Sequence, residues 1–211
     1  MTEKLLLMIA EKYPITPIDG DCVDDLKVSG MKFNIRAYHA EGLGQVSVMT
    51  AKGFFGLMKM DTLIVNPSEV DLPLYSYDRI FAMGNDTLIV ELYDTLSRGD
   101  FSIEDVKAKY SSLTERDPGE HWYDSIKLPE SISKKGKKAD TPALSRLATE
   151  HLTAYLDAAR PTDNPEVKKE KASLYVEGLL SKGGPSTDAF KKAIGEEKTA
   201  DLFRNILFGT K

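Results

Sequence analysis

The stretch of the chain that decides the fold is 74–93, which reads LYSYDRIFAMGNDTLIVELY. Two runs rich in apolar and aromatic residues, 74–83 and 87–93, flank a turn signal at Gly84-Asn85-Asp86. Runs of this composition bounded by turn residues are typical of β-strands. Because the connection is so short, the two strands are expected to pair antiparallel, since a parallel pair needs a crossover of about a dozen residues or more.

The same pattern continues outward towards the N-terminus. The runs 33–38 and 44–49 alternate apolar and polar residues, which is typical of half-buried strands, and a third run covers 56–65. Gly42-Leu43-Gly44 marks a turn between the first two. From about residue 31 to residue 95 the sequence therefore predicts consecutive antiparallel strands.

Helical patterns dominate the second half of the chain. The sequence predicts helices at 102–110, from Thr141 to about 160, at about 165–180, at 186–195 and at about 198–208. The polar region 116–140 predicts a loop. Strands followed by helices predict one α+β domain over 1–211, with a central antiparallel sheet flanked by helices.

The composition excludes several classes of function. The chain has 211 residues, 41% of them hydrophobic and 29% charged, which is ordinary for a globular protein. Its net charge of −5 gives no general attraction for nucleic acid or an anionic membrane, so neither is expected as a partner. The apolar run 5–10 is too short to span a bilayer.

Cysteine usage and missing motifs narrow the possibilities further. Cys22 is the only cysteine, which excludes an internal disulfide framework and a cysteine-cluster metal site. A lone cysteine fits a reducing compartment, and we expect a cytoplasmic protein. The sequence has no glycine-rich phosphate loop and no Gly-x-Ser-x-Gly elbow, which disfavours nucleotide binding and hydrolase chemistry.

Two segments resemble the ferredoxin-dependent bilin reductases and the related red chlorophyll catabolite reductase. The first is Asp71-Leu72-Pro73-Leu74-Tyr75-Ser76-Tyr77-Asp78, which is similar to the family's D-L-P-hydrophobic-x-x-x-D stretch and is followed by a hairpin partner at 88–92. The second is Ala193-Ile194-Gly195-Glu196-Glu197 with the closing Ile206-Leu207-Phe208, which resembles the family's A-F-G-E-E segment and terminal L-L-F. Both occur in the family's order and at compatible distances.

This resemblance implies a three-layer α/β/α sandwich that holds an open-chain tetrapyrrole between the sheet and the C-terminal helices. It also implies a reductase that binds no cofactor of its own and takes electrons from an acidic small protein, ferredoxin or flavodoxin. Asp78 matches the family's sheet aspartate, which helps donate protons to the bilin. Such a donor is chemically required, because electrons added to a conjugated tetrapyrrole build up negative charge that an acid within hydrogen-bond reach neutralises. Burial of a carboxyl raises its pKa and lets it hold a proton near neutrality.

The resemblance is incomplete in two places. The family commonly carries a glutamate and a histidine on the strands before the D-L-P stretch, whereas this chain has Met49-Thr50-Ala51 and Met60-Asp61-Thr62, in which Asp61 is the only acid. Where the family often has Asn-Asp-Lys-Thr, this chain has Gly183-Gly184-Pro185-Ser186. Two alternatives therefore stay open: a non-catalytic tetrapyrrole-binding or carrier protein on the same fold, and an interaction domain without a small ligand.

Several other residues are candidates for contacts with a ligand or a partner, each with a structural alternative. Basic residues on or near the predicted sheet could bind the carboxylates of a tetrapyrrole or could simply be exposed strand residues: Arg36, Lys52, Lys59 and Arg79. His121 and Trp122 could close over a flat ligand or anchor an ordinary loop. The basic run 134–138 could dock an acidic electron donor or form a solvated loop.

Overall fold

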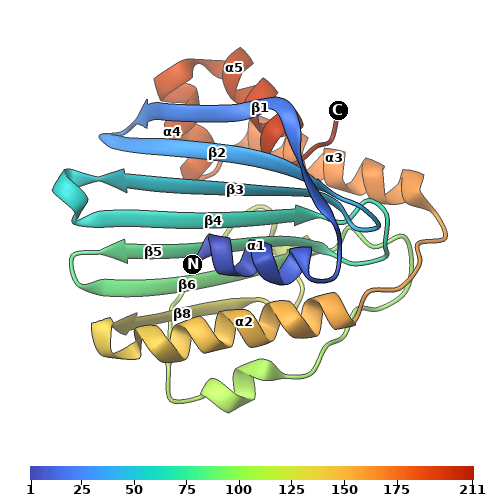
Figure 1. Ribbon diagram of the computed structural model, residues 1–211, viewed down its shortest axis with the longest axis horizontal. Helices are drawn as coiled ribbons and strands as arrows, with labels where there is room; N and C mark the ends of the chain where they lie inside the picture. Colours follow the sequence, from blue (N-terminus) through green and yellow to red (C-terminus); the bar gives the residue numbers. More distant parts are fainter.

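The computed structural model describes the backbone of all 211 residues and every side chain except those of Asp19, Asp21 and Pro185. Over this described chain the strands form one antiparallel sheet of eight in the order β1-β2-β3-β4-β5-β6-β8-β7 (Figure 1). The strands are β1 (Ile15–Val28), β2 (Met31–Ala40), β3 (Gly44–Gly53), β4 (Met58–Asn66), β5 (Leu74–Ala82), β6 (Asn85–Tyr93), β7 (Thr114–Glu115) and β8 (Ile132–Lys137).

Helices cover both sides of this sheet. The helices are α1 (Thr2–Ala10), α2 (Thr141–Asp157), α3 (Pro165–Lys182), α4 (Pro185–Ile194) and α5 (Glu196–Asp201), which continues into the π-helical segment η5 (Leu202–Leu207). In Figure 1, α1 and α2 lie in front of the sheet, which we call its front face, and α3, α4 and α5 lie behind it, on its rear face. The expected three-layer α+β sandwich is confirmed.

Each face of the sheet has its own hydrophobic core because successive side chains of a strand point to opposite faces. The front core joins α1 and α2 to the sheet through residues such as Leu5, Leu152 and Tyr77. The rear core joins α3, α4 and η5 to the sheet through residues such as Ile35 and Tyr175.

The structure corrects the sequence prediction in three segments. A long first strand, β1, precedes the predicted ones, and two register shifts against β2 interrupt its alternation and hide it in the sequence. The region 102–110 forms only the short 3-10 turn η2 (Val106–Tyr110) instead of a helix. Part of the predicted loop 116–140 is strand β8, which pairs with the edge of β6, a long-range contact that local composition does not report.

Strand β8 also changes the interpretation of the basic run 134–138. Lys134 is buried on β8, where its Nζ donates to the carboxylate of Glu115 at 2.5 Å and to the carbonyl of Leu113 at 3.3 Å. It is therefore a structural residue and is not free for docking. The side chains of Lys135, Lys137 and Lys138 are exposed or half-buried at the surface.

The Asp71-Leu72-Pro73 segment is held in place by a buried lysine. Lys168 of α3 donates from Nζ to the carbonyl of Leu72 at 2.6 Å and to that of Thr95 at 3.2 Å. Burial lowers the pKa of Lys168 to about 8, although the carboxylate of Asp71 lies 3.9 Å away and opposes that shift. This contact ties α3 to the start of β5 and so sets the distance between the helix and the rear face.

Arg79 and Asp86 form a buried ion pair on the front face. Both side chains are 1% exposed, and Arg79 Nη2 donates to Asp86 at 2.7 Å while Nε donates to its other oxygen. The hydroxyl of Thr141 donates to Asp86 at 2.6 Å, so the pair also fixes the start of α2 against the β5–β6 hairpin. Removing one member would leave an uncompensated charge in the core.

We therefore expect Asp86→Ala to lower the free energy of unfolding by about 3–5 kcal/mol, measured by urea titration, because it leaves the buried Arg79 guanidinium without its partner charge. The double variant Arg79→Met/Asp86→Leu buries no charge and should lose clearly less. A change of under about 1 kcal/mol in Asp86→Ala would contradict this account.

Candidate functional site

The candidate site is a pocket between the rear face of the sheet and helices α3, α4 and η5. It encloses about 640 Å³ when the solvent space at its open mouth is included. Its sheet-borne wall comes from β3 to β6, and its other walls come from the loop at Tyr123 and from the helices. The polar residues that line it are Thr62, Ser76, Asp78, Glu91, Tyr93, Tyr123, Tyr175, Ser186 and Thr187.

Asp78 projects from the middle of β5 into this pocket. Its register partner Thr62 on β4 donates from Oγ1 to Asp78 Oδ1 at 2.5 Å. Burial is the main cause that raises the pKa of Asp78 to about 6; the negative charge of Glu91 adds to the rise, and the Thr62 hydroxyl opposes it. A carboxyl with this pKa is partly protonated near neutral pH and can serve as an acid.

Glu91 on β6 is the second carboxyl that lines the pocket. Tyr93, two residues further on the same face, donates from its hydroxyl to Glu91 Oε2 at 2.6 Å. Lys127 Nζ lies 3.8 Å from Glu91 Oε1 and 2.5 Å from Asp124. Glu91 therefore connects the interior of the pocket with a charged cluster beside it.

Aromatic rings from the sheet, from the loop at Tyr123 and from the C-terminal helices also line the pocket. The rings of Tyr93 and Tyr175 lie with centroids 4.3 Å apart and 30° between their planes, and Tyr123 meets Tyr93 edge-on at 5.5 Å. Phe208 meets Tyr175 edge-on at 5.9 Å. Flat, polarisable walls of this kind suit a planar conjugated ligand, because offset stacking and edge contacts add to the area buried.

The rear face beside Asp78 is only partly covered. Ile80 follows Asp78 on the same face of β5, Ile89 is the register partner of Asp78 on β6, and Met60 pairs with Ile80 from β4. All three apolar side chains are partly exposed. Asp78 thus lies between the enclosed pocket and an open apolar stretch of sheet.

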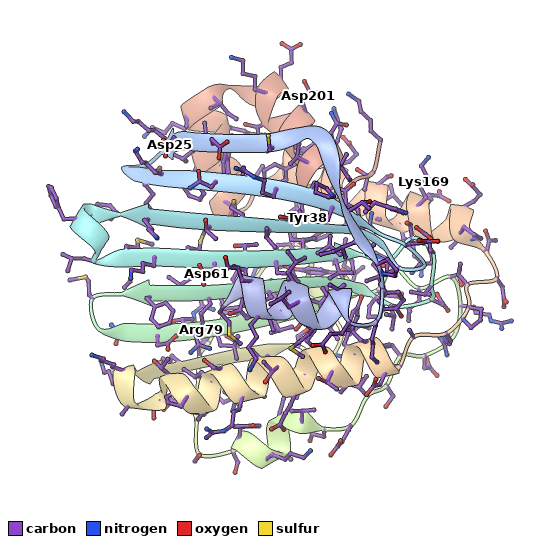
Figure 2. All side chains as sticks on the ribbon, viewed as in Figure 1. Asp25, Tyr38, Asp61, Arg79, Lys169 and Asp201 are labelled. Atoms are coloured by element: carbon purple, nitrogen blue, oxygen red, sulfur yellow. The ribbon has the colours of Figure 1, made fainter. Side chains whose placement is uncertain are left out.

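The structure does not bring Asp61 or Arg79 to this pocket. In register terms Asp61 pairs with Arg79, and both lie on the front face (Figure 2). The amino group of Met1 lies 3.1 Å from Asp61, and Arg79 forms its ion pair with Asp86. A ligand behind the sheet cannot reach either residue, so their predicted role in binding it gains no support from their placement.

Three other predicted contacts are displaced for the same reason. Arg36 lies on the front face and pairs with Asp24 at 2.6 Å. Lys52 and Lys59 are exposed and directly opposite each other on β3 and β4, again on the front face. Lys52 follows Ala51 and Lys59 precedes Met60; both of these neighbours face the rear, so the two lysines lie on the other side of the sheet.

His121 and Trp122 flank the pocket without lining it. The ring of His121 stacks on Tyr123 at 4.9 Å, and Tyr123 itself lines the pocket. Trp122 packs against Gly178 of α3, donates from Nε1 to the carbonyl of Gly183 at 3.1 Å and lies under Lys182. The pair therefore anchors the loop that positions Tyr123.

Sequence reasoning missed most of the pocket. The one local signal was Glu91, a charged residue inside the apolar run 88–92. Tyr175 and Thr187 come from helices whose contact with the sheet is set by packing, and no sequence pattern predicts it. Among the side chains that the structure describes, no three His, Cys, Asp or Glu residues converge as a metal site would require.

Comparison with solved structures places this architecture beside phytochromobilin synthase from tomato, in a crystal structure of its complex with biliverdin. The TM-score is 0.75, the sequence identity is 14%, and the match covers 100% of this chain and 84% of that chain. No family model matches the sequence, and no curated protein is similar to it in sequence. At this identity the likeness establishes the fold, which is the one that the sequence resemblance implied.

The raised pKa of Asp78 has a consequence for stability. Because the folded state holds the Asp78 proton more tightly than the unfolded chain, its stability falls as pH rises from about 3.8 to about 6 and stays lower above that range. We expect Asp78→Asn to be more stable than the wild type by about 1–2 kcal/mol at pH 7.5 in urea titrations. The difference should shrink towards pH 4, and a variant less stable at pH 7.5 would refute the assignment.

The Trp122 anchor can be tested through Gly178. A Cβ added there would lie 2.2 Å from the Trp122 ring, so Gly178→Ala must displace the indole. Although alanine favours a helix by about 1 kcal/mol, we expect a net loss of about 1–3 kcal/mol and a red shift of tryptophan emission. Ser181→Ala, on an exposed position of the same helix, is the matched control and should change neither quantity.

Proposed function

We propose that the rear-face pocket binds an open-chain tetrapyrrole and that the protein reduces it with electrons from a small redox protein, ferredoxin or flavodoxin. The observation that carries the proposal is Asp78, a carboxyl with a pKa of about 6 that lines an aromatic pocket. Three further points support it: the sequence resemblance around Asp78, the fold shared with a biliverdin-bound protein, and the flat aromatic wall.

The proposed reaction consumes two electrons and two protons for each double bond that is reduced. The electrons arrive one at a time from the external donor, and each raises the basicity of the tetrapyrrole. Asp78 delivers one proton, because burial raises its pKa to about 6 and keeps a fraction of it protonated near neutral pH. We assign the second proton to Glu91, the other carboxyl that lines the pocket; because Glu91 is negatively charged beforehand, it first takes up this proton from solvent and then passes it on. The two acids come from neighbouring strands of the hairpin, so both lie along one edge of a ligand on the rear face.

A non-catalytic tetrapyrrole carrier is the second candidate. It is favoured by the residues that β3 and β4 present to the pocket, which are Met49, Thr62 and Ile64 and which do not titrate near neutrality. A carrier needs the aromatic walls and a closed pocket but no proton source. The two candidates therefore differ in the fate of the pigment once it is bound.

The deciding experiment is the visible absorption of the protein with biliverdin, recorded anaerobically before and after reduced ferredoxin is added. A reductase should shift the pigment spectrum on binding and then convert it to a product. Asp78→Asn should keep the binding shift and lose turnover by about 10²–10⁴-fold, and Glu91→Gln should lose less, because it affects only the second proton.

Asp61→Asn is the matched control, because it removes a carboxylate from the neighbouring strand on the opposite face, and it should turn over at the wild-type rate. A binding shift that stays unchanged under reductant would favour the carrier. Turnover that survives in Asp78→Asn would refute the assigned proton donor, and the absence of any binding shift would refute both candidates.

A further inference from the structure

Three hairpin turns project from the same end of the sheet, at the left of Figure 1. They connect β1 to β2 at Ser29-Gly30, β3 to β4 at 54–57, and β5 to β6 at Met83-Gly84. The second and third turns carry large apolar side chains into solvent. Phe55 is 108% exposed and Met83 is 88% exposed, and Phe54 and Leu57 are exposed as well.

These apolar residues occupy positions that suit other side chains better. Phe54, Phe55 and Met83 all have positive φ, at 52°, 55° and 50°. Apart from glycine, asparagine and aspartate tolerate this conformation best, and a two-residue hairpin turn such as Met83-Gly84 favours asparagine in its first position. Neither burial nor turn geometry explains why bulky apolar side chains occupy these three positions. The simplest reason is that they contact something other than this chain.

A row of lysines crosses the front face behind these tips. Lys27, Lys32, Lys52 and Lys59 are register partners in succession on β1, β2, β3 and β4, so their side chains lie side by side. Like charges directly opposite each other destabilise a sheet. Among the described side chains, one carboxylate offsets the row, that of Asp25, 3.3 Å from Lys32.

An apolar hollow joins the two hydrophobic tips. It is lined by Leu57 from one hairpin, by Phe81 and Ala82 beside the other, and by Pro142 and Lys138 at the start of α2. The hollow encloses about 810 Å³, open mouth included. The tips and the hollow together make one apolar edge with lysines next to it.

From this arrangement we propose that the hairpin end of the sheet docks on an anionic phospholipid surface. Phe55 lies three residues beyond Lys52; at about 3.3 Å per extended residue the aromatic tip reaches at most roughly 10 Å beyond the lysine row, because residues 54–56 form a turn. Apolar side chains of surface-bound proteins penetrate the boundary between headgroups and acyl chains by about 5–10 Å. The lysines then lie at the level of the lipid phosphates.

The shape of the surface favours a bilayer over a protein partner. The apolar groups stand on separate projecting turns, and a fluid lipid surface accommodates such projections, whereas a protein interface requires a matching cavity for each of them. The net charge of −5 predicted no attraction between the whole chain and an anionic membrane, but a net charge does not show the local positive charge of the lysine row. No helix of the described chain has the length and apolarity to cross a bilayer.

The test is co-sedimentation of the full chain with vesicles of phosphatidylcholine and phosphatidylserine, beside vesicles of phosphatidylcholine alone. We expect binding to the anionic vesicles only, and release at about 1 M salt, where the Debye length falls to about 3 Å. Phe55→Asn/Met83→Asn should cut the partition coefficient at least about tenfold, because it removes the inserted groups. Both changes suit their backbone conformations, so thermal stability should hold or rise.

Charge reversal gives the second arm of the test. Lys52→Glu/Lys59→Glu should lower the partition coefficient at least about tenfold, since each lysine near an anionic surface contributes several-fold. The matched controls are Leu174→Asn, an exposed apolar residue of α3, and Lys169→Glu, an exposed lysine of the same helix, and both should bind as the wild type does.

Absence of wild-type binding to anionic vesicles would overturn the proposal, as would equal losses in the control variants. If the vesicles do not bind but Lys52→Glu/Lys59→Glu weakens the complex with reduced ferredoxin, the surface belongs to an acidic protein partner instead. The vesicle results do not depend on whether the rear-face pocket reduces a tetrapyrrole.

Discussion

The strict alternation of side chains along β5 is the constraint on which the rest of the structure depends. Tyr75, Tyr77 and Arg79 point to the front face and join the core beneath α1 and α2, while Ser76 and Asp78 point to the rear pocket. A shift of one residue would bury Asp78 in the front core and bring Arg79 to the pocket. Every partner of β5 follows this alternation, because register pairs share a face.

Two neighbouring charges on this strand therefore meet opposite environments. Arg79 is fully buried and paired with Asp86, an arrangement that holds the hairpin and α2 together. Among the described side chains, Asp78 has the hydroxyl of Thr62 as its one hydrogen-bond partner; it faces a cavity, and its pKa rises because burial disfavours the charged form. The first residue contributes to the fold, whereas the second has a shifted pKa of the kind that is common at functional sites.

The sheet also separates its functions along the strands. Its centre, where helices cover the rear face, forms the aromatic pocket that suits a planar ligand. Its hairpin end carries exposed phenylalanine and methionine above a row of lysines, which suits a surface contact. Antiparallel strands make this separation possible, because all the turns of one kind gather at a single edge.

The sequence by itself determined the antiparallel β-hairpins from residue 31 to residue 95 and the C-terminal helices, and it singled out Asp78 as a candidate, because period-two alternation, turn residues and a local motif lie in neighbouring positions. It did not reveal β1, whose alternation is interrupted, or β8, which exists through pairing with β6. Only the tertiary structure decided that Asp61, Lys52, Lys59, Arg36 and Arg79 face away from Asp78, and that Glu91, Tyr175 and Thr187 surround it. The physical reason is that the register of a strand decides on which face of the sheet each side chain lies. The walls that the helices supply depend on packing between residues about a hundred positions apart, which no local pattern encodes.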